Sequence, residues 1–213
     1  MESQPNLTLE QYQYLATSEA NITGNEYQQL ACFTESPPNY EMWCRFMRVR
    51  NHLTCTLDIL RGHLSFIDAA KKFVFYGKEN EEHGIKVEEI GHLGPQFPTF
   101  APADAKFLRI FHAMIGIMSE CEEFIDPLLA GMESSLAIDH LNGIEEFGDV
   151  AWYMAVGSDA LDTKLQQVFK ANISKLCKRY KEKNFSSEAA INRDTKAEAE
   201  AMLEATERGQ GYA

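Results

Sequence analysis

Apolar residues recur every three or four positions along several long stretches of the chain, which is the spacing of one face of an α-helix. In residues 42–75 they stand at the following positions: Leu53, Leu57, Leu60, Leu64, Ile67 and Phe75. Gly77 follows shortly afterwards and is expected to end this helix. Residues 104–129 have the same spacing, and Pro127 is expected to kink or end that second helix.

Shorter segments also favour helices. They span residues 8–20, 141–157, 159–180 and a final stretch that ends at 204. Thr8 is a candidate N-cap for the first of them, and Ser186 or Ser187 for the last. Residues 79–103 contain three prolines and three glycines and are expected to form a loop, with room for a short helix or strand at 85–90. Because no convincing run alternates between apolar and polar residues, the pattern predicts an all-α protein built as a helical bundle.

A length of 213 residues fits a single domain with a hydrophobic core. Residues 21–103 are expected to form an added helical insertion or a degenerate duplicated hairpin. The tripeptide Phe-Ile-Asp occurs at 66–68 and again at 124–126, which fits either a duplication or chance. Residues 104–204 are the expected functional core, and residues 205–213 the expected frayed tail.

Two of the predicted helices each carry two acidic residues three positions apart. Glu120 and Glu123 form one pair, and Glu146 and Asp149 form the other. Residues with this spacing share a helix face, so antiparallel packing of the two helices would bring four carboxylates together. Four buried anions need compensation, and Mg²⁺ or Mn²⁺ prefers a ligand set made of oxygen atoms. Such an ion would provide a platform for metal-assisted hydrolysis.

Acidic pairs with this spacing are also common on solvated helix faces, which is the alternative interpretation. The flanking sequence favours a buried site, because apolar residues surround both pairs, for example at 116–118 and 150–153. Gly148, inside the second pair, lowers helix propensity and indicates a close approach by another helix or by a ligand.

Overall charge limits the classes of partner. The chain has 20 Lys and Arg residues against 32 Asp and Glu residues, a net charge of −12, which argues against nonspecific binding to nucleic acid or to an anionic membrane. No segment approaches the roughly 18 apolar residues of a membrane span, and the polar start of the chain has neither secretory-signal nor transit-peptide features. The five cysteines lack metal or redox spacing, so we expect free thiols and a cytoplasmic location.

Residues 164–183 reverse this charge locally, with seven basic residues and a single acid, Glu182. Lys175 and Arg179 are one helical turn apart and share a face with Asn172. Such a face suits the outer oxygens of a polyphosphate, although a basic solvated surface is the alternative.

Together these segments resemble the MazG-like all-α nucleoside triphosphate pyrophosphohydrolases, and among them the small phage-type members. The similar stretches are residues 116–126, 145–153, 172–180, 185 and 190–194. The family's metal motif, E-x-x-E followed by E-x-x-D, corresponds to the two acidic pairs. The resemblance covers about residues 107–204, which makes this stretch the expected MazG-like catalytic core.

The resemblance implies Mg²⁺-dependent hydrolysis of a (deoxy)nucleoside triphosphate to the monophosphate and pyrophosphate, with Mn²⁺ as a substitute cation. It implies that Glu120 and Glu123 are catalytic and that these two residues hold metal together with Glu146 and Asp149. It assigns the substrate phosphates to Asn172, Lys175, Arg179 and Tyr180. Four further residues are candidates for the site: His112, Asp126, Asn192 and Arg193. For His112, a core or rim position and a role near the base both stay open.

The resemblance also implies a homo-oligomer, either a dimer or a tetramer, that acts in nucleotide-pool control in the cytoplasm of a phage host. It leaves open whether dGTP and dATP or dUTP and dCTP are the substrates. Family members often carry a Lys-rich segment between the two acidic helices, but here the similar residues 71–78 precede both, so their reach into the site is open. A catalytically inactive nucleotide-binding module and a helical interaction protein with an acidic surface are the alternative functions.

Overall fold

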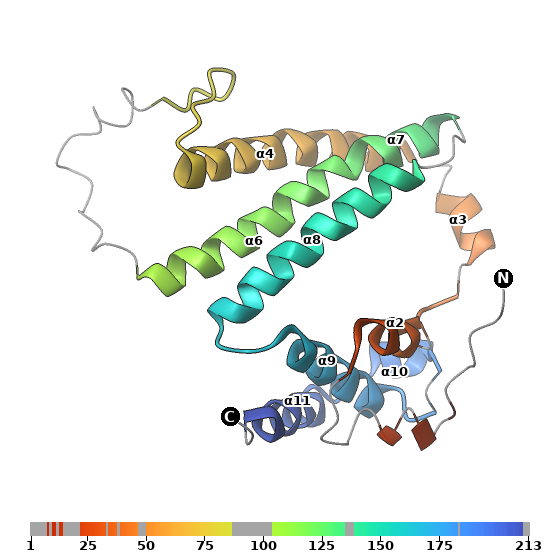
Figure 1. Ribbon diagram of the computed structural model, residues 1–213. Coiled ribbons are helices and arrows are strands. Elements are labelled where there is room, and N and C mark those ends of the chain that lie inside the picture. The colour runs from red at the N-terminus through yellow and green to blue at the C-terminus, as the bar shows by residue number, and fades with distance from the viewer. Residues whose placement is uncertain are drawn as a thin grey trace. The chain divides into compact units, whose positions relative to one another are not determined.

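The computed structural model describes residues 8, 10, 11, 13, 14, 22–32, 34–37, 39–46, 50–86, 104–134, 139–182 and 184–210. The helices in Figure 1 are α2 (Gly24–Cys32), α3 (Tyr40–Phe46), α4 (Arg50–Tyr76), α6 (Ala105–Glu123), α7 (Ile125–Ser134), α8 (His140–Ala160), α9 (Leu165–Arg179), α10 (Ser187–Ile191) and α11 (Thr195–Gln210). Within these described residues, β pairing is limited to an isolated antiparallel bridge between Asn80 and Ile85. The prediction of an all-α protein is therefore confirmed for this part of the chain.

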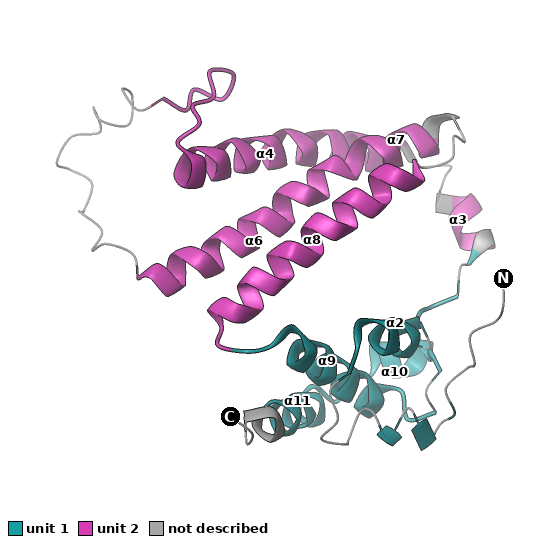
Figure 2. Cartoon of the chain, viewed as in Figure 1, with its two compact units in different colours: residues 1–40, 163–213 teal, residues 41–162 magenta. Residues whose placement is uncertain are grey.

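The chain forms two compact units, coloured separately in Figure 2. Unit 1 consists of residues 1–40 and 163–213, and unit 2 consists of residues 41–162. The predicted insertion at 21–103 and the predicted core at 104–204 each contribute residues to both units, and that division stays a prediction. No helix within the described ranges is long and apolar enough to cross a membrane.

Unit 2 is built around α6, which packs against both α4 and α8, while α7 also contacts α4. Small residues on α6 allow this close packing, since Ala113 and Gly116 are both buried. A side chain at Gly116 would overlap the ring of Tyr153, which comes from α8. The absence of a Cβ atom at this position therefore lets α8 approach α6 near the acidic pairs.

Gly148 behaves differently from the prediction. A Cβ atom built at this position on α8 would meet no other described atom within 4 Å, and the residue is exposed. The expected approach of another helix is therefore wrong for the described residues, because the close approach occurs at Gly116 instead. A ligand at Gly148 stays a prediction.

Unit 1 has its core where α9 packs against α2 and α11. Ile22, Leu30 and Ile173 are fully buried there. The ring of Tyr27 stacks on Phe169 with centroids 4.4 Å apart, which joins α2 to α9. Because burying such apolar surface is the main favourable contribution to folding, this cluster holds the N-terminal helix on the C-terminal ones.

Several predicted helix ends are confirmed. Thr8 is an N-cap, since its Oγ1 accepts a hydrogen bond from the Gln11 N–H at 3.2 Å and Gln11 Oε1 accepts one from the Thr8 N–H at 2.7 Å. Residues 15–20 of that predicted helix lie outside the described residues. Helix α4 ends before Gly77, whose φ of 67° suits glycine. Pro127 lies in the first turn of α7, where the missing N–H is tolerated, so one predicted helix becomes α6 and α7.

Other boundaries differ from the prediction. The expected helix over 159–180 is wrong at its start, because α8 continues to Ala160 and α9 begins only at Leu165. The expected single helix up to residue 204 is also wrong. Ser186 caps the short α10, and a new helix starts after Asp194, whose Oδ1 accepts a hydrogen bond from the Ala197 N–H at 3.0 Å. This second helix, α11, continues past the predicted start of the frayed tail.

Candidate metal centre

Three of the predicted metal ligands converge in unit 2. Glu120 lies near the end of α6, and Glu146 and Asp149 lie one turn apart on α8, which packs against α6. One carboxylate oxygen from each of the three lies within 4.8 Å of the others. Glu120 and Glu146 are only 6% and 2% exposed, whereas Asp149 is exposed. This arrangement suits a metal ion that is held from the protein side and open to solvent.

Glu123, the fourth predicted ligand, is exposed and lies outside this group of three. It nevertheless acts on Glu146. Burial is the largest of the causes that together raise the pKa of Glu146 to about 7, and the charges of Glu123 and Glu120 and a hydrogen bond to Glu123 are the next. Without a cation, this carboxyl group is therefore partly protonated near neutral pH.

Asn142 also contacts this centre, and no sequence motif indicated it. Its Nδ2 donates a hydrogen bond to Glu146 Oε1 at 2.8 Å, from one turn earlier on α8. Its Oδ1 is buried and has no hydrogen-bond partner among the described residues. A buried oxygen without a donor, on a side chain that binds Glu146, adds to the oxygen-rich character of the site.

Lys71 is a second member of the centre, from the segment 71–78 whose reach into the site the sequence left open. It comes from α4, is 4% exposed, and its Nζ lies 3.2 Å from Glu120 Oε1. Burial would lower its pKa, but hydrogen bonds with Tyr153, Asp68 and Glu120 raise it above the usual value, so the ammonium is charged. The predicted segment 71–78 therefore reaches the acidic centre through Lys71.

The rest of that segment faces other groups. Lys72 Nζ pairs with Asp68 Oδ2 at 2.5 Å, and Lys78 is exposed. Tyr76 lies edge-on to His112, with centroids 6.1 Å apart. None of these three has a described contact with the carboxylate group, so the connection rests on Lys71.

His112 lies in an aromatic cluster next to the centre. Its ring stacks on Phe75 with centroids 3.9 Å apart and lies edge-on to Tyr153 at 5.6 Å. Burial and the charge of Lys71 lower its pKa, and its Nε2 is buried without a partner among the described residues. These contacts are those of a neutral histidine packed at the rim of the core. Asp126 is exposed and pairs with Arg61, so it lies apart from the group of three.

The predicted phosphate-binding residues all belong to unit 1. Asn172 Oδ1 accepts a hydrogen bond from the Tyr27 hydroxyl at 3.4 Å, and Lys175 is half-buried on α9. Arg179 donates from Nε and Nη2 to the two oxygens of Glu198, at 2.9 Å each. Tyr180 is buried next to Phe185, with ring centroids 5.9 Å apart.

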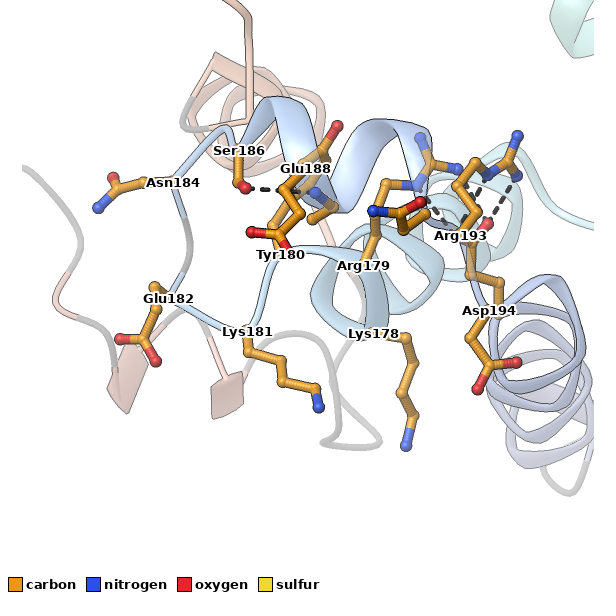
Figure 3. A pocket seen from close by; sticks show the side chains of 13 residues that line it. Lys178, Arg179, Tyr180, Lys181, Glu182, Asn184, Ser186, Glu188, Arg193 and Asp194 are labelled. Carbon is orange, nitrogen blue, oxygen red and sulfur yellow. Dashed lines mark hydrogen bonds and ion pairs between the residues drawn. The ribbon is translucent and has the colours of Figure 1, made fainter.

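A pocket of about 580 Å³ lies in unit 1 and is shown in Figure 3. Among its lining residues are four that the sequence indicated: Arg179, Tyr180, Asn192 and Arg193. Asn172 and Lys175 are not among them. Arg193 also binds Glu198, with its Nη2 2.7 Å from Oε2, so both arginines use part of their donor set on one carboxylate.

Glu198 is the residue that the sequence did not reveal in this unit. It is 3% exposed, and hydrogen bonds from Arg179 and then Arg193 hold its pKa at about 2. Arg179 is 19 residues away, and Arg193, five residues earlier, precedes α11, so neither contact has the i, i+3 or i, i+4 spacing of a helix. Its partners follow from the tertiary packing of α9 and α11.

The chain matches no protein-family model, no curated protein and no solved structure. The similarity to MazG-like enzymes therefore rests on the sequence motifs, and the site's geometry has to be interpreted by its own chemistry.

Proposed function

We propose that this protein is a Mg²⁺-dependent hydrolase that cleaves a (deoxy)nucleoside triphosphate to the monophosphate and pyrophosphate. The observation that carries the proposal is the group of three carboxylates, Glu120, Glu146 and Asp149, with ligand oxygens within 4.8 Å of one another. Oxygen-only ligand sets favour Mg²⁺ or Mn²⁺ over zinc.

The residues fit such an ion. Glu146 is buried among other carboxylates and has a raised pKa, which is the signature of anions that lack compensation. Glu120, Glu146 and Asp149 would hold the ion, with Glu123 beside them. When bound, Mg²⁺ supplies charge neutralisation of the phosphates and a water of lowered pKa.

The protein's own groups then have distinct tasks. Glu123 is exposed and adjoins Glu146, so it is our candidate for the base that accepts a proton from the attacking water. The water oxygen attacks the α-phosphorus, the bond from this phosphorus to the bridging oxygen breaks, and pyrophosphate leaves with the bond's electron pair. Glu120 keeps its orientation because Lys71 and Ser119 hold its Oε1.

The resemblance supports phosphate contacts from Asn172, Lys175, Arg179 and Tyr180. For Arg179, Nε and one hydrogen of Nη2 are engaged with Glu198, so a phosphate contact would come from Nη1 or from the second hydrogen of Nη2. We also propose a homo-oligomer. Its support is the set of large apolar side chains that α6 and α8 expose, among them Phe107, Phe111 and Trp152.

A product assay tests this function. The eight common ribo- and deoxynucleoside triphosphates and dUTP would each be incubated with the protein, in Mg²⁺ and in EDTA, and all phosphate products resolved. Monophosphate with an equal amount of pyrophosphate, formed only with Mg²⁺, is the expected result. Nucleotide binding without turnover would contradict the proposal and favour the inactive nucleotide-binding module.

A further inference from the structure

The ammonium group of Lys71 is fully engaged by other side chains of the protein. An ammonium group has three N–H donors and no acceptor. Its Nζ lies 2.6 Å from Ser119 Oγ, 3.2 Å from Glu120 Oε1 and 3.2 Å from Asp68 Oδ1. Tyr153 also hydrogen-bonds with this ammonium, so four groups of the protein compete for three donors and leave no hydrogen for a substrate phosphate. Its role must therefore be exercised through the residues that it contacts.

Residues from three helices surround the ammonium group of Lys71. Asp68 and Lys71 come from α4, Ser119 and Glu120 come from α6, and the ring of Tyr153 comes from α8. The Nζ lies 5.3 Å from the centroid of that ring, at a distance where a cation and an aromatic face attract each other. A buried ammonium persists only where partners compensate it, and here one of its two carboxylate partners, Glu120, is a candidate metal ligand.

We infer that Lys71 is the resident counter-ion of the carboxylate centre: it stabilises Glu120 when no divalent cation is bound, and its charge weakens the binding of such a cation. The inference rests on the proposed function, because it concerns the same metal centre. Lys71 and a divalent cation share the negative charge of Glu120, and the two cations repel each other. With Lys71 in place, the protein folds without a divalent cation at the centre, but it binds such a cation more weakly.

The test compares the wild type with Lys71→Met, which keeps an unbranched side chain one atom shorter and removes the charge. Thermal unfolding would be followed in EDTA and in excess Mg²⁺, and Mn²⁺ binding would be titrated by electron paramagnetic resonance. In EDTA the variant is expected to melt at a lower temperature than the wild type. Mg²⁺ is expected to raise its Tm by more than it raises that of the wild type. The Mn²⁺ Kd is expected to fall about tenfold, the low end of the effect of a close charge pair.

Two further variants are matched controls. Lys71→Arg keeps the positive charge and is expected to keep a metal dependence close to that of the wild type. Lys72→Met removes the neighbouring, more exposed lysine, which pairs with Asp68 alone among the described residues, and it is expected to change neither the Mn²⁺ Kd nor the Mg²⁺-induced shift.

The outcomes separate the hypotheses. An equal loss of Tm in EDTA and in Mg²⁺, with an unchanged Mn²⁺ Kd, would overturn the inference, because a purely structural lysine behaves in this way. A Lys71→Met protein that is unfolded in both solutions would also overturn it, whereas one that folds only on addition of Mg²⁺ would support it. If neither the wild type nor any variant bound Mn²⁺, the proposed function itself would fail.

Discussion

Two buried glutamates, one in each unit, have opposite surroundings. Glu146 in unit 2 is 2% exposed, and Glu198 in unit 1 is 3% exposed. Two arginines bind Glu198 and hold its pKa at about 2. Burial and the carboxylates of Glu123 and Glu120 raise the pKa of Glu146 to about 7. Similar burial therefore leaves Glu198 ionised and Glu146 only partly ionised near neutral pH, and the neighbouring charges cause this difference.

The difference separates an acid that belongs to the fold from one that belongs to a site. The chain supplies every counter-ion that Glu198 needs, so its role is complete within the protein. Among the described residues, Lys71 is the cation of this centre, but its ammonium group contacts Glu120, Asp68 and Ser119. The remaining negative charge calls for a cation from solution, and this is the basis of the proposed metal centre.

The largest expected effect concerns activity. Glu123→Gln and Asp149→Asn are each expected to lower hydrolysis by at least about 10²-fold, because they remove the base and a metal ligand. Circular dichroism would check that both variants fold, and the product assay would measure the rate. Glu145→Gln, an exposed neighbour on α8, is the matched control and should keep wild-type activity. Wild-type rates in either site variant would make the assignment wrong.

The next effect concerns the stability of unit 1. Glu198→Gln leaves two arginines without their shared carboxylate, and breaking such a buried pair is expected to lower the free energy of unfolding by about 3 kcal/mol. Urea unfolding at pH 7 measures this loss. A change below about 0.5 kcal/mol, typical of surface positions, would mean that the pair is not the structural element described above.

In EDTA, Glu146→Gln is expected to raise the free energy of unfolding, whereas Glu198→Gln lowers it. In EDTA above pH 7, the wild type carries an uncompensated charge at this position, so the neutral variant should be more stable, by up to about 3 kcal/mol. Excess Mg²⁺ should reverse the order, because only the wild type retains the full ligand set. Equal stability of the two proteins under both conditions would remove the contrast between the two glutamates.

The two glutamates also predict opposite pH dependence. The folded-state pKa of Glu198 is depressed from 4.5 to about 2, so its contribution is present above pH 4.5 and is lost as the pH falls toward 2. The folded-state pKa of Glu146 is raised from 4.5 to about 7. In EDTA, its contribution to the free energy of unfolding therefore falls as the pH rises through that interval. Unfolding curves of the wild type and the two glutamine variants across pH 2–8 would identify each contribution.

The smallest expected effect is at Gly148. An added Cβ there meets open space, so Gly148→Ala should stabilise α8 by up to about 1 kcal/mol. The same change at Gly116 should instead cost about 1–3 kcal/mol, since the methyl group would overlap the ring of Tyr153. If Gly148→Ala kept its stability but lost hydrolysis, a ligand would approach α8 at this position, as the sequence suggested.

The sequence predicted those features that local spacing determines. The helical period located α4, α6 and α8, and the i, i+3 spacing placed Glu146 and Asp149 on one face toward Glu120. Helix ends were harder to predict, because capping by a single side chain, as at Asp194, divides a stretch that is otherwise expected to be one helix.

Pairs formed by tertiary packing were missed. Lys71 contacts Glu120 across 49 residues, and Arg179 contacts Glu198 across 19 residues. No periodicity connects such positions, and a lysine or glutamate that will be buried has the same local signature as a solvated one. The sequence therefore predicts a phosphate contact for Arg179 but does not reveal its carboxylate partner, Glu198.

The most direct measurement is a Mn²⁺ titration of the wild type, Asp149→Asn and Glu198→Gln, followed by electron paramagnetic resonance. If unit 2 contains a carboxylate centre that needs an external cation, the wild type binds Mn²⁺, Asp149→Asn binds it at least about tenfold more weakly, and Glu198→Gln binds it as the wild type does. A wild type that binds no Mn²⁺, or an Asp149→Asn variant with unchanged affinity, would contradict the assignment of this centre.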